Sequence, residues 1–214
     1  MRTTALLACA VILTAAAPEQ SHVNIVFDGD SIAASVGASP PYRLDTLAAV
    51  SLGPDAVRLH NVSASGRPVS DCLRLYPTLV APLFDATERA NVIVFHAGDN
   101  DVNRDHSADQ IYNDLASYIA KAHVQGWRVI VSTELYRPDF PANKEAQLEA
   151  YNRLVLANSA GADAVVDFNK NPLMTNLVNR TKPSLFHDRL HPSDGGYLIL
   201  AGMINPVLAQ VIAR

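Results

Sequence analysis

A serine stands directly behind an acidic turn in the stretch Ile25–Ser35, which reads IVFDGDSIAAS. The apolar residues 25–27 predict the end of a buried strand, and residues 28–30 predict a polar turn after it. A serine where a strand meets a helix presents its hydroxyl and its own N–H at one place, which suits a nucleophile for acyl transfer. Serine is also a common helix N-cap. Ser31 is therefore a candidate nucleophile that requires a base.

His191 is the candidate base. Asp188 precedes it by three residues, a spacing that lets the carboxylate bend back onto one ring nitrogen and leave the other free. An exposed loop histidine near the start of a helix explains the same pattern. His96 and His187 are competitors, but His96 ends an apolar run and suits a buried core histidine, whereas His187 suits the rim of a site.

An acyl-transfer site also needs hydrogen-bond donors for the negative oxygen that forms during the reaction. Gly66 ends the polar turn 63–66, and Asn100 lies in the polar turn 98–101, each after an apolar run. A glycine N–H on a tight turn and an asparagine amide can both act as such donors. Both residue types are also ordinary in turns, so neither identifies a site alone.

Five apolar runs predict the strands that must position these residues, and most are continuous, as in strands covered on both faces. The predicted strands are 22–27, 57–62, 91–96, 128–133 and 164–168. The predicted helices cover 107–126, the surroundings of 148–155, part of 72–90 broken by Pro77 and Pro82, and a last helix from about 192 that Pro206 kinks or divides. This alternation predicts one α/β domain with a parallel sheet between two layers of helices.

The carboxyl ends of parallel strands form the usual ligand-binding edge of such a sheet. Ser31 follows the first predicted strand, Gly66 the second and Asn100 the third, and the pair Asp188 and His191 precedes the last helix. We therefore expect all five residues to meet at one edge.

Taken together, these blocks resemble the SGNH hydrolases, also called GDSL esterases or lipases. The matching blocks are Gly29-Asp30-Ser31, Gly66, Gly98-Asp99-Asn100-Asp101 and Asp188-Arg189-Leu190-His191. The resemblance covers essentially the whole chain after its N-terminal segment. It implies a flavodoxin-like three-layer α/β/α sandwich with a five-stranded parallel sheet.

The resemblance also implies the role of each site residue. Ser31 is expected to be the nucleophile, His191 the base and Asp188 the residue that orients it. The N–H groups of Ser31 and Gly66 and the side chain of Asn100 are expected to form the oxyanion hole, without a metal or another cofactor. The implied activity is hydrolysis of carboxylic esters through an acyl-enzyme on Ser31, with short-chain acyl or acetyl esters as substrates.

Four aspartates near these blocks raise separate questions. Asp99 departs from the family, which often has a small or hydroxylated residue there, and Asp28 is a further acid before the serine turn. Asp30 and Asp101 are expected to hold their own turns by accepting backbone N–H groups.

Two other functions fit part of the pattern. The acidic turns and nearby histidines have the residue types of a metal-dependent phosphoesterase, but the usual opening Asp-x-His is missing and Ser31 would have no role. A non-catalytic ligand-binding protein on the same fold remains the third reading, although all the expected catalytic groups are present.

Composition limits the partners. The chain has 214 residues, of which 49% are hydrophobic and 18% charged, with a formal net charge of −4 and no long basic run. A globular domain with a sizeable core fits these values, and nucleic-acid binding does not. The expected partner is a small-molecule ester or an ester of a carbohydrate or lipid.

The N-terminus predicts export. The apolar run 5–17 follows a single arginine, is short for a bilayer and ends in small residues, so residues 1–16 read as a signal peptide cleaved after Ala16. An uncleaved anchor or a core helix is the alternative. We expect a single catalytic domain over 17–214 that is secreted or periplasmic and is not stably inserted in a membrane. Cleavage leaves Cys72 as the remaining cysteine, which suits a buried small hydrophobe.

Residues after the fourth strand and before the Asp/His pair are the candidate substrate contacts. The expected substrate-binding residues are Tyr136, Arg137 and Phe186, with Phe140, Leu173, Met174 and Leu177 as further wall candidates. They offer some apolar surface but no long hydrophobic lid, which favours short acyl chains.

Overall fold

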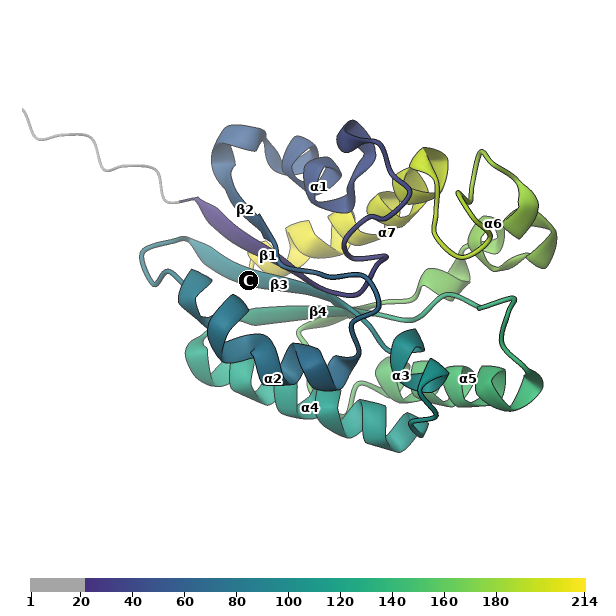
Figure 1. Ribbon diagram of the computed structural model, residues 1–214. Coiled ribbons are helices and arrows are strands. Elements are labelled where there is room, and N and C mark those ends of the chain that lie inside the picture. The colour runs from purple at the N-terminus through teal and green to yellow at the C-terminus, as the bar shows by residue number, and fades with distance from the viewer. Residues whose placement is uncertain (1–21) are drawn as a thin grey trace, which may run out of the picture.

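The computed structural model describes residues 22–214 and contains one five-stranded parallel sheet in the order β2-β1-β3-β4-β5 (Figure 1). The strands are β1 (Val23–Gly29), β2 (Val57–Asn61), β3 (Ala90–His96), β4 (Arg128–Ser132) and β5 (Ala164–Val166). Each lies within a few residues of its predicted range. The expected three-layer α/β/α fold is confirmed.

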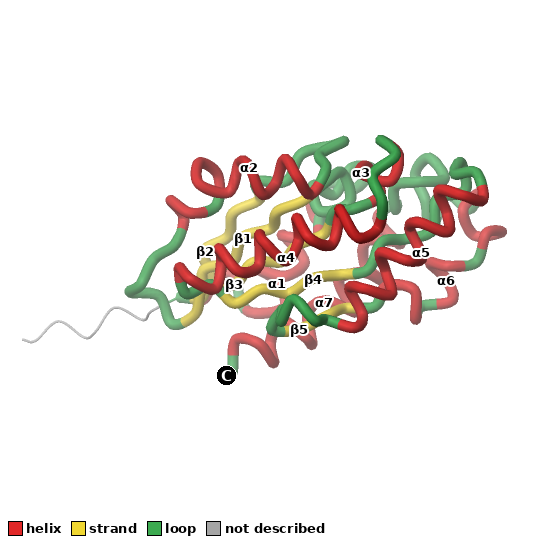
Figure 2. Tube along the Cα trace, turned by 90° about the horizontal axis from the view of Figure 1, so that it is seen from below, coloured by secondary structure: helices red, strands yellow, loops and turns green. Residues whose placement is uncertain are grey.

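Between and after the strands, residues 22–214 form seven α-helices and five short 3-10 helices. The α-helices are α1 (Leu44–Leu52), α2 (Val69–Leu79), α3 (Asp99–Asn103), α4 (Ala108–Gln125), α5 (Ala142–Ala157), α6 (Pro172–Thr175) and α7 (Asp194–Ile212). The 3-10 helices are η1 (Pro40–Tyr42), η2 (Pro54–Ala56), η3 (Ala81–Leu83), η4 (Phe168–Lys170) and η5 (Leu177–Thr181). Figure 2 shows α2, α4 and α5 on one side of the sheet and α7 on the other.

Each face of the sheet has its own hydrophobic core, and the alternation of strand side chains divides residues between them. Within β3, Ile93 and Phe95 pack with α2, α4 and α5, while Val92 and Val94 pack with α1 and α7. All seven residues of β3 are buried, which explains why the strand is apolar from Val92 to Phe95.

Several helix signals in the sequence are correct. Ser107 and Gln110 form the expected capping box of α4, and Gly126 ends that helix in the left-handed conformation. Pro77 lies inside α2, and the helix continues past it to Leu79. Pro206 lies inside α7 without dividing it.

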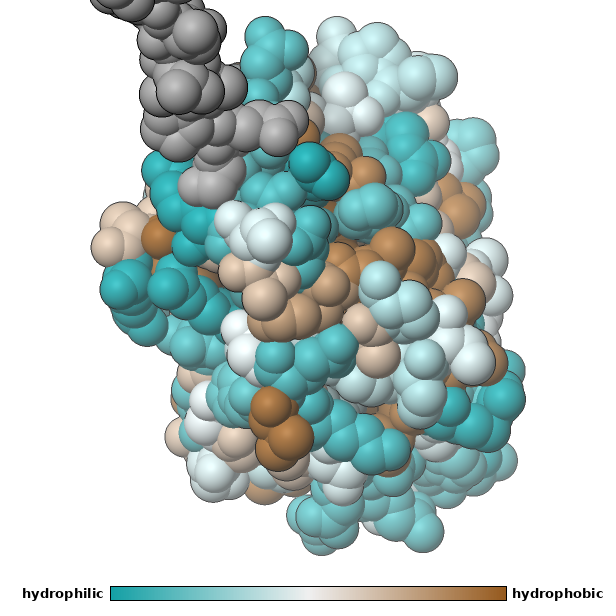
Figure 3. Space-filling view, turned by 90° about the vertical axis from the view of Figure 1, so that its left-hand side faces the viewer, coloured by the Kyte–Doolittle hydropathy of each residue, from teal (hydrophilic) through white to brown (hydrophobic). Residues whose placement is uncertain are grey.

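By length and composition, α7 is apolar enough to cross a membrane. Its apolar side chains are accounted for by packing, since Tyr197, Leu200, Ile204 and Leu208 are buried against α1 and the sheet. Figure 3 shows the end of the molecule at which the strands begin. On this face, hydrophobic residues lie among hydrophilic ones.

Candidate active site

The serine turn is built on a glycine. β1 ends at Gly29, which has a φ of 144°, and a Cβ there would lie 1.9 Å from the carbonyl oxygen of His96 on β3. Only glycine lets the chain turn this close to the neighbouring strand. Residues 31–37 then form consecutive turns instead of the expected helix. Ser31 consequently has no helix to cap, which removes the alternative reading of this residue.

The structure brings Ser31, His191 and Asp188 into one hydrogen-bonded chain. The Oγ atom of Ser31 lies 2.9 Å from Nε2 of His191, and Nδ1 of His191 lies 2.7 Å from Oδ2 of Asp188. Oδ1 of Asp188 accepts the backbone N–H groups of His191 and Leu190 at 2.8 and 3.1 Å. A carboxylate fixed in this way favours the ring tautomer that has Nδ1 protonated and leaves Nε2 free to accept a proton from the serine.

Hydrogen bonds also set the charge of Asp188. Desolvation alone would raise the pKa of its carboxyl group, but the hydrogen bonds and the charge interaction that it receives from His191 outweigh this and lower the pKa. The carboxylate therefore stays ionised at neutral pH and favours a positive charge on the ring during proton transfer. A backbone hydrogen bond of 2.8 Å from His187 to the carbonyl of His191 closes the loop that carries both residues.

Gly66 lies in a tight turn after β2. The N–H of Ala64 bonds to the carbonyl of Gly29 at 3.0 Å, and the N–H of Arg67 bonds back to the carbonyl of Ala64 at 3.2 Å. Gly66 has a φ of 75°, a conformation that favours glycine, and its carbonyl accepts a 3.0 Å hydrogen bond from Arg104. The central N–H of such a turn is not used by the turn's own hydrogen bond.

Asn100 lies in the first turn of α3, directly after the end of β3. Gly98 precedes it with a φ of 156°, and a Cβ there would lie 2.3 Å from the ring of Tyr151. Oδ2 of Asp101 accepts the N–H of Val69 at 2.8 Å, so this carboxylate joins α3 to the start of α2, whereas the sequence predicted that it would hold its own turn. Gly66 and Asn100 thus follow β2 and β3, the two strands that flank β1 and its serine.

Asp30 stabilises its own turn, as expected from the sequence. Oδ1 accepts the N–H of Ile32 at 2.9 Å. Burial, followed by the negative charge of Asp99, raises the pKa of Asp30 well above its usual value.

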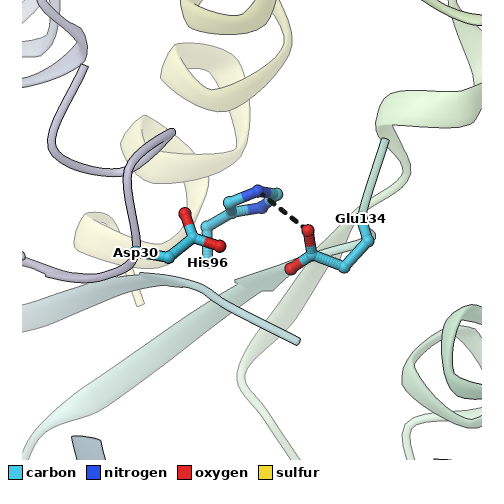
Figure 4. A group of neighbouring side chains, drawn as sticks. All are labelled: Asp30, His96 and Glu134. Carbon is cyan, nitrogen blue, oxygen red and sulfur yellow. Dashed lines mark ion pairs between the residues drawn. The ribbon is translucent and has the colours of Figure 1, made fainter. Parts of the chain in front are cut away.

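Behind the serine turn lies a buried cluster of Asp30, His96 and Glu134 (Figure 4). Each offers one possible ligand atom, and these atoms lie within 4.8 Å of one another, so the cluster could hold a cation. Burial raises the pKa of Glu134 well above its usual value and lowers that of His96 to about 3. The 3.3 Å contact between Nε2 of His96 and Oε2 of Glu134 therefore joins two groups that favour their neutral forms.

The depressed pKa of His96 predicts a specific dependence of stability on pH. The unfolded chain takes up a proton on this ring below about pH 6.5, while the folded chain does not until about pH 3. His96 therefore contributes stability that is present above pH 6.5 and is lost as the pH falls, by about 1.4 kcal/mol per pH unit. Thermal unfolding of the wild type and of His96→Gln at pH 7.5 and 5 should show the gap between their Tm values narrowing at pH 5. Parallel changes in the two proteins would contradict this assignment.

The guanidinium of Arg137, an expected substrate contact, is occupied by other groups. It bonds to Asp99 at 3.1 Å and to both oxygens of Asp139 at 3.1 and 2.7 Å, and it stacks on the ring of Phe140 at 4.4 Å. Its side chain is 9% exposed. Asp99 is therefore paired with a positive charge. Burial raises the pKa of its carboxyl group, and Arg137 offsets part of this increase.

The other expected substrate residues lie in different surroundings. Phe186 is 2% exposed and packs under the guanidinium of Arg180 at 4.2 Å, within the core instead of on an open wall. Tyr136 lines a cavity of about 490 Å³ between α5 and the segment that follows β5. The other residues lining this cavity are Glu145, Glu149, Asn152, Arg153, Leu156, Asn169, Thr175 and Leu177.

Sequence reasoning missed the residues that hold the site from behind. Glu134 follows the fourth predicted strand, but nothing in the sequence indicates that its side chain lies against His96. Arg67 stands next to Gly66, and its partner Asp28 precedes the serine turn. The order of the strands gave the only available signal, because β1 and β2 are neighbours and the residues after them must lie close together.

Comparisons with known proteins agree with this geometry. The sequence model of the GDSL-like Lipase/Acylhydrolase family matches residues 27–199. No curated protein matches the chain in sequence.

Several solved structures share the fold. TesA is 23% identical, with a TM-score of 0.68 over 89% of this chain and 99% of the other. A member of the lipolytic protein G-D-S-L family from Veillonella parvula is 20% identical, with a TM-score of 0.70 over 87% and 98%. Axe2, an acetylxylan esterase from Geobacillus stearothermophilus, is 19% identical, with a TM-score of 0.63 over 91% and 96%. Because the family match extends over most of the chain, the protein belongs to the GDSL-like lipase/acylhydrolase family and is a carboxylic ester hydrolase.

Proposed function

We propose that the protein is a serine esterase that hydrolyses short-chain acyl or acetyl esters through an acyl-enzyme on Ser31. The observation that carries this proposal is the continuous chain from Asp188 through His191 to Ser31, with contacts of 2.7 and 2.9 Å. These distances are those of a nucleophile, its base and the group that orients the base.

The reaction has two steps. Oγ of Ser31 attacks the ester carbonyl carbon while Nε2 of His191 takes the hydroxyl proton, and the protonated ring then gives that proton to the departing alcohol. A water molecule next attacks the acyl-enzyme, again giving its proton to His191, and Ser31 recovers the proton as the carboxylic acid leaves. Asp188 remains ionised throughout and holds the ring in place.

The negative oxygen formed in each step would be bound by three donors. We assign these to the backbone N–H groups of Ser31 and Gly66 and to the side-chain amide of Asn100. The assignment is supported by their positions after three adjacent strands, β1, β2 and β3. Donors held in place before the reaction stabilise the transition state without further reorganisation.

The preference for short acyl groups rests on where the large apolar side chains lie. Of the candidate wall residues, Phe140, Met174 and Phe186 are at most 9% exposed and offer little surface to a long acyl chain. Leu173 and Leu177 are 48% and 54% exposed. Axe2, a structure with the same fold, is an acetylxylan esterase.

A panel of nitrophenyl esters with acyl chains of increasing length tests the proposal. We expect kcat/KM to be highest for acetyl and to fall as the chain lengthens, because the buried Phe140, Met174 and Phe186 offer little surface to extra methylenes. A maximum for long chains would overturn the short-chain preference while leaving the esterase reading intact. Loss of turnover on prolonged EDTA treatment, restored by manganese or zinc, would instead favour the metal-dependent phosphoesterase.

The buried cluster does not favour that alternative. Asp30, His96 and Glu134 are each at most 3% exposed, so a cation held there would not meet a substrate. A phosphoesterase metal must contact the phosphoryl group directly.

We also propose that the enzyme is exported, with residues 1–16 as its signal peptide. These residues lie outside the part of the chain that the structure describes, so the proposal rests on their composition. The N-terminal mass of the protein recovered from the periplasm or medium should correspond to a start at Ala17. An N-terminus at Met1 in a membrane fraction would overturn it.

A further inference from the structure

The two backbone donors of the proposed oxyanion hole lie on different loops. Ser31 follows β1, and Gly66 lies in the turn after β2. The hole exists only if these loops hold a fixed position relative to each other, because a donor displaced by about 1 Å can cost on the order of 100-fold in rate. Whatever connects the loops therefore controls the geometry of the hole.

Among the described residues, three hydrogen bonds join the turn 64–67 to the rest of the protein. One is the backbone bond from Ala64 to Gly29, and another reaches the carbonyl of Gly66 from the exposed Arg104. The third is buried: Nη1 of Arg67 bonds to Oδ1 of Asp28 at 2.9 Å, between side chains that are 11% and 2% exposed.

Asp28 connects both loops to the helical layer. Oδ1 accepts the N–H of Gly29 at 2.8 Å in addition to the guanidinium of Arg67, and Oδ2 accepts the hydroxyl of Tyr118 on α4 at 2.7 Å. One carboxylate thus contacts the chain directly before Asp30 and Ser31, the residue directly after Gly66, and a fully buried tyrosine of the core.

Keeping this carboxylate buried has a cost. Burial raises the pKa of Asp28 to about 6, although the hydrogen bonds from Tyr118, Arg67 and Gly29 all lower it. Replacing a buried ion pair with apolar residues of similar size is often neutral or stabilising. A role in stability alone is therefore a weak explanation for a charge at this position.

We propose that Asp28 and Arg67 are positioning residues for the oxyanion hole: their ion pair holds the Gly66 turn against the serine turn, so that the N–H groups of Gly66 and Ser31 point at the same oxygen. Neither residue touches the reacting atoms. The inference rests on the proposed function, because it assigns a task only if those N–H groups bind an oxyanion.

Asp28→Asn tests the pair with little change of shape. The amide keeps an oxygen for Gly29 or Tyr118 but loses the charge that binds Arg67. We expect kcat per active site to fall about 10- to 100-fold, with KM changing less than about threefold, because the lost geometry matters in the transition state. Arg67→Gln should lower kcat by a similar factor, and Arg67→Lys should be faster than Arg67→Gln because it keeps the positive charge. The double variant Asp28→Asn/Arg67→Gln should be no slower than either single variant.

Glu88→Gln is the matched control. Glu88 is 9% exposed and pairs with Arg58 at 2.7 Å just before β3, at the opposite end of the sheet. The Glu88→Gln variant should have a lower Tm than the wild type and an unchanged kcat per active site. If Asp28→Asn likewise lowers only the Tm, with kcat within about twofold of wild type, the positioning role is overturned. Turnover by Ser31→Ala would instead overturn the proposed function itself, so the two failures are distinguishable.

Discussion

Replacing Ser31 with alanine is expected to abolish ester hydrolysis and leave the fold intact. Loss of the nucleophile in a serine hydrolase lowers kcat on the order of 10⁶-fold. The Oγ atom bonds to His191 at 2.9 Å and caps no helix, so its removal should change the free energy of unfolding by less than about 1 kcal/mol. Turnover of nitrophenyl acetate and thermal unfolding of both proteins measure the two effects.

Ser35→Ala provides the matched control for this variant. Ser35 belongs to the same series of turns and is 2% exposed, but its Oγ accepts the N–H of Leu44 at 2.9 Å, which is a structural role. A serine-directed phosphonate should label Ser31 in the wild type and in Ser35→Ala, and label nothing in Ser31→Ala. Near wild-type turnover by a folded Ser31→Ala protein would end the serine esterase interpretation.

Replacing Asn100 with alanine is expected to lower kcat far more than it raises KM. A bond to the carbonyl oxygen strengthens as negative charge develops there, so its loss belongs mainly to the transition state. One such donor contributes ~10²–10³ in kcat, or about 3–4 kcal/mol. Asn100→Asp should be slower still, because it places a carboxylate against the forming oxyanion and between Asp99 and Asp101.

Asn103→Ala separates this role from a purely structural one. Asn103 lies on α3 like Asn100, but it is exposed and at the other end of the helix. Its replacement should leave kcat and KM near their wild-type values. If a stable Asn100→Ala protein has a kcat within a few-fold of wild type, the loss is far smaller than expected for an oxyanion donor. Asn100 would then not belong to the oxyanion hole.

The amino-acid sequence by itself determined the architecture. Strands covered on both faces are rich in apolar residues on both sides, and β1 and β3 show this as the continuous runs 25–27 and 92–95. Alternation of these runs with helical patterns dictates a parallel sheet, and a parallel sheet gathers the residues after its strands at one edge. Ser31, Gly66 and Asn100 could therefore be placed together from their order alone.

Local spacing was also sufficient for the Asp188/His191 pair, since both partners lie within three residues of each other. The 2.9 Å contact between His191 and Ser31 joins residues 160 positions apart, and only the packing of the loop before α7 against the serine turn decides it. The same holds for residues 31–37, which form consecutive turns where the sequence suggested that a helix begins after the first strand.

Only the tertiary structure decided what the buried charges do. Asp28 and Arg67, Asp99 and Arg137, and the cluster around His96 each join segments that no periodicity connects. The sequence had suggested Phe186 and Arg137 as substrate contacts. In the tertiary structure, Phe186 lies in the core and the guanidinium of Arg137 is bonded to Asp99. The physical reason is that apolar burial follows a pattern repeated along the chain, whereas a buried polar group is satisfied by one partner at one position in space.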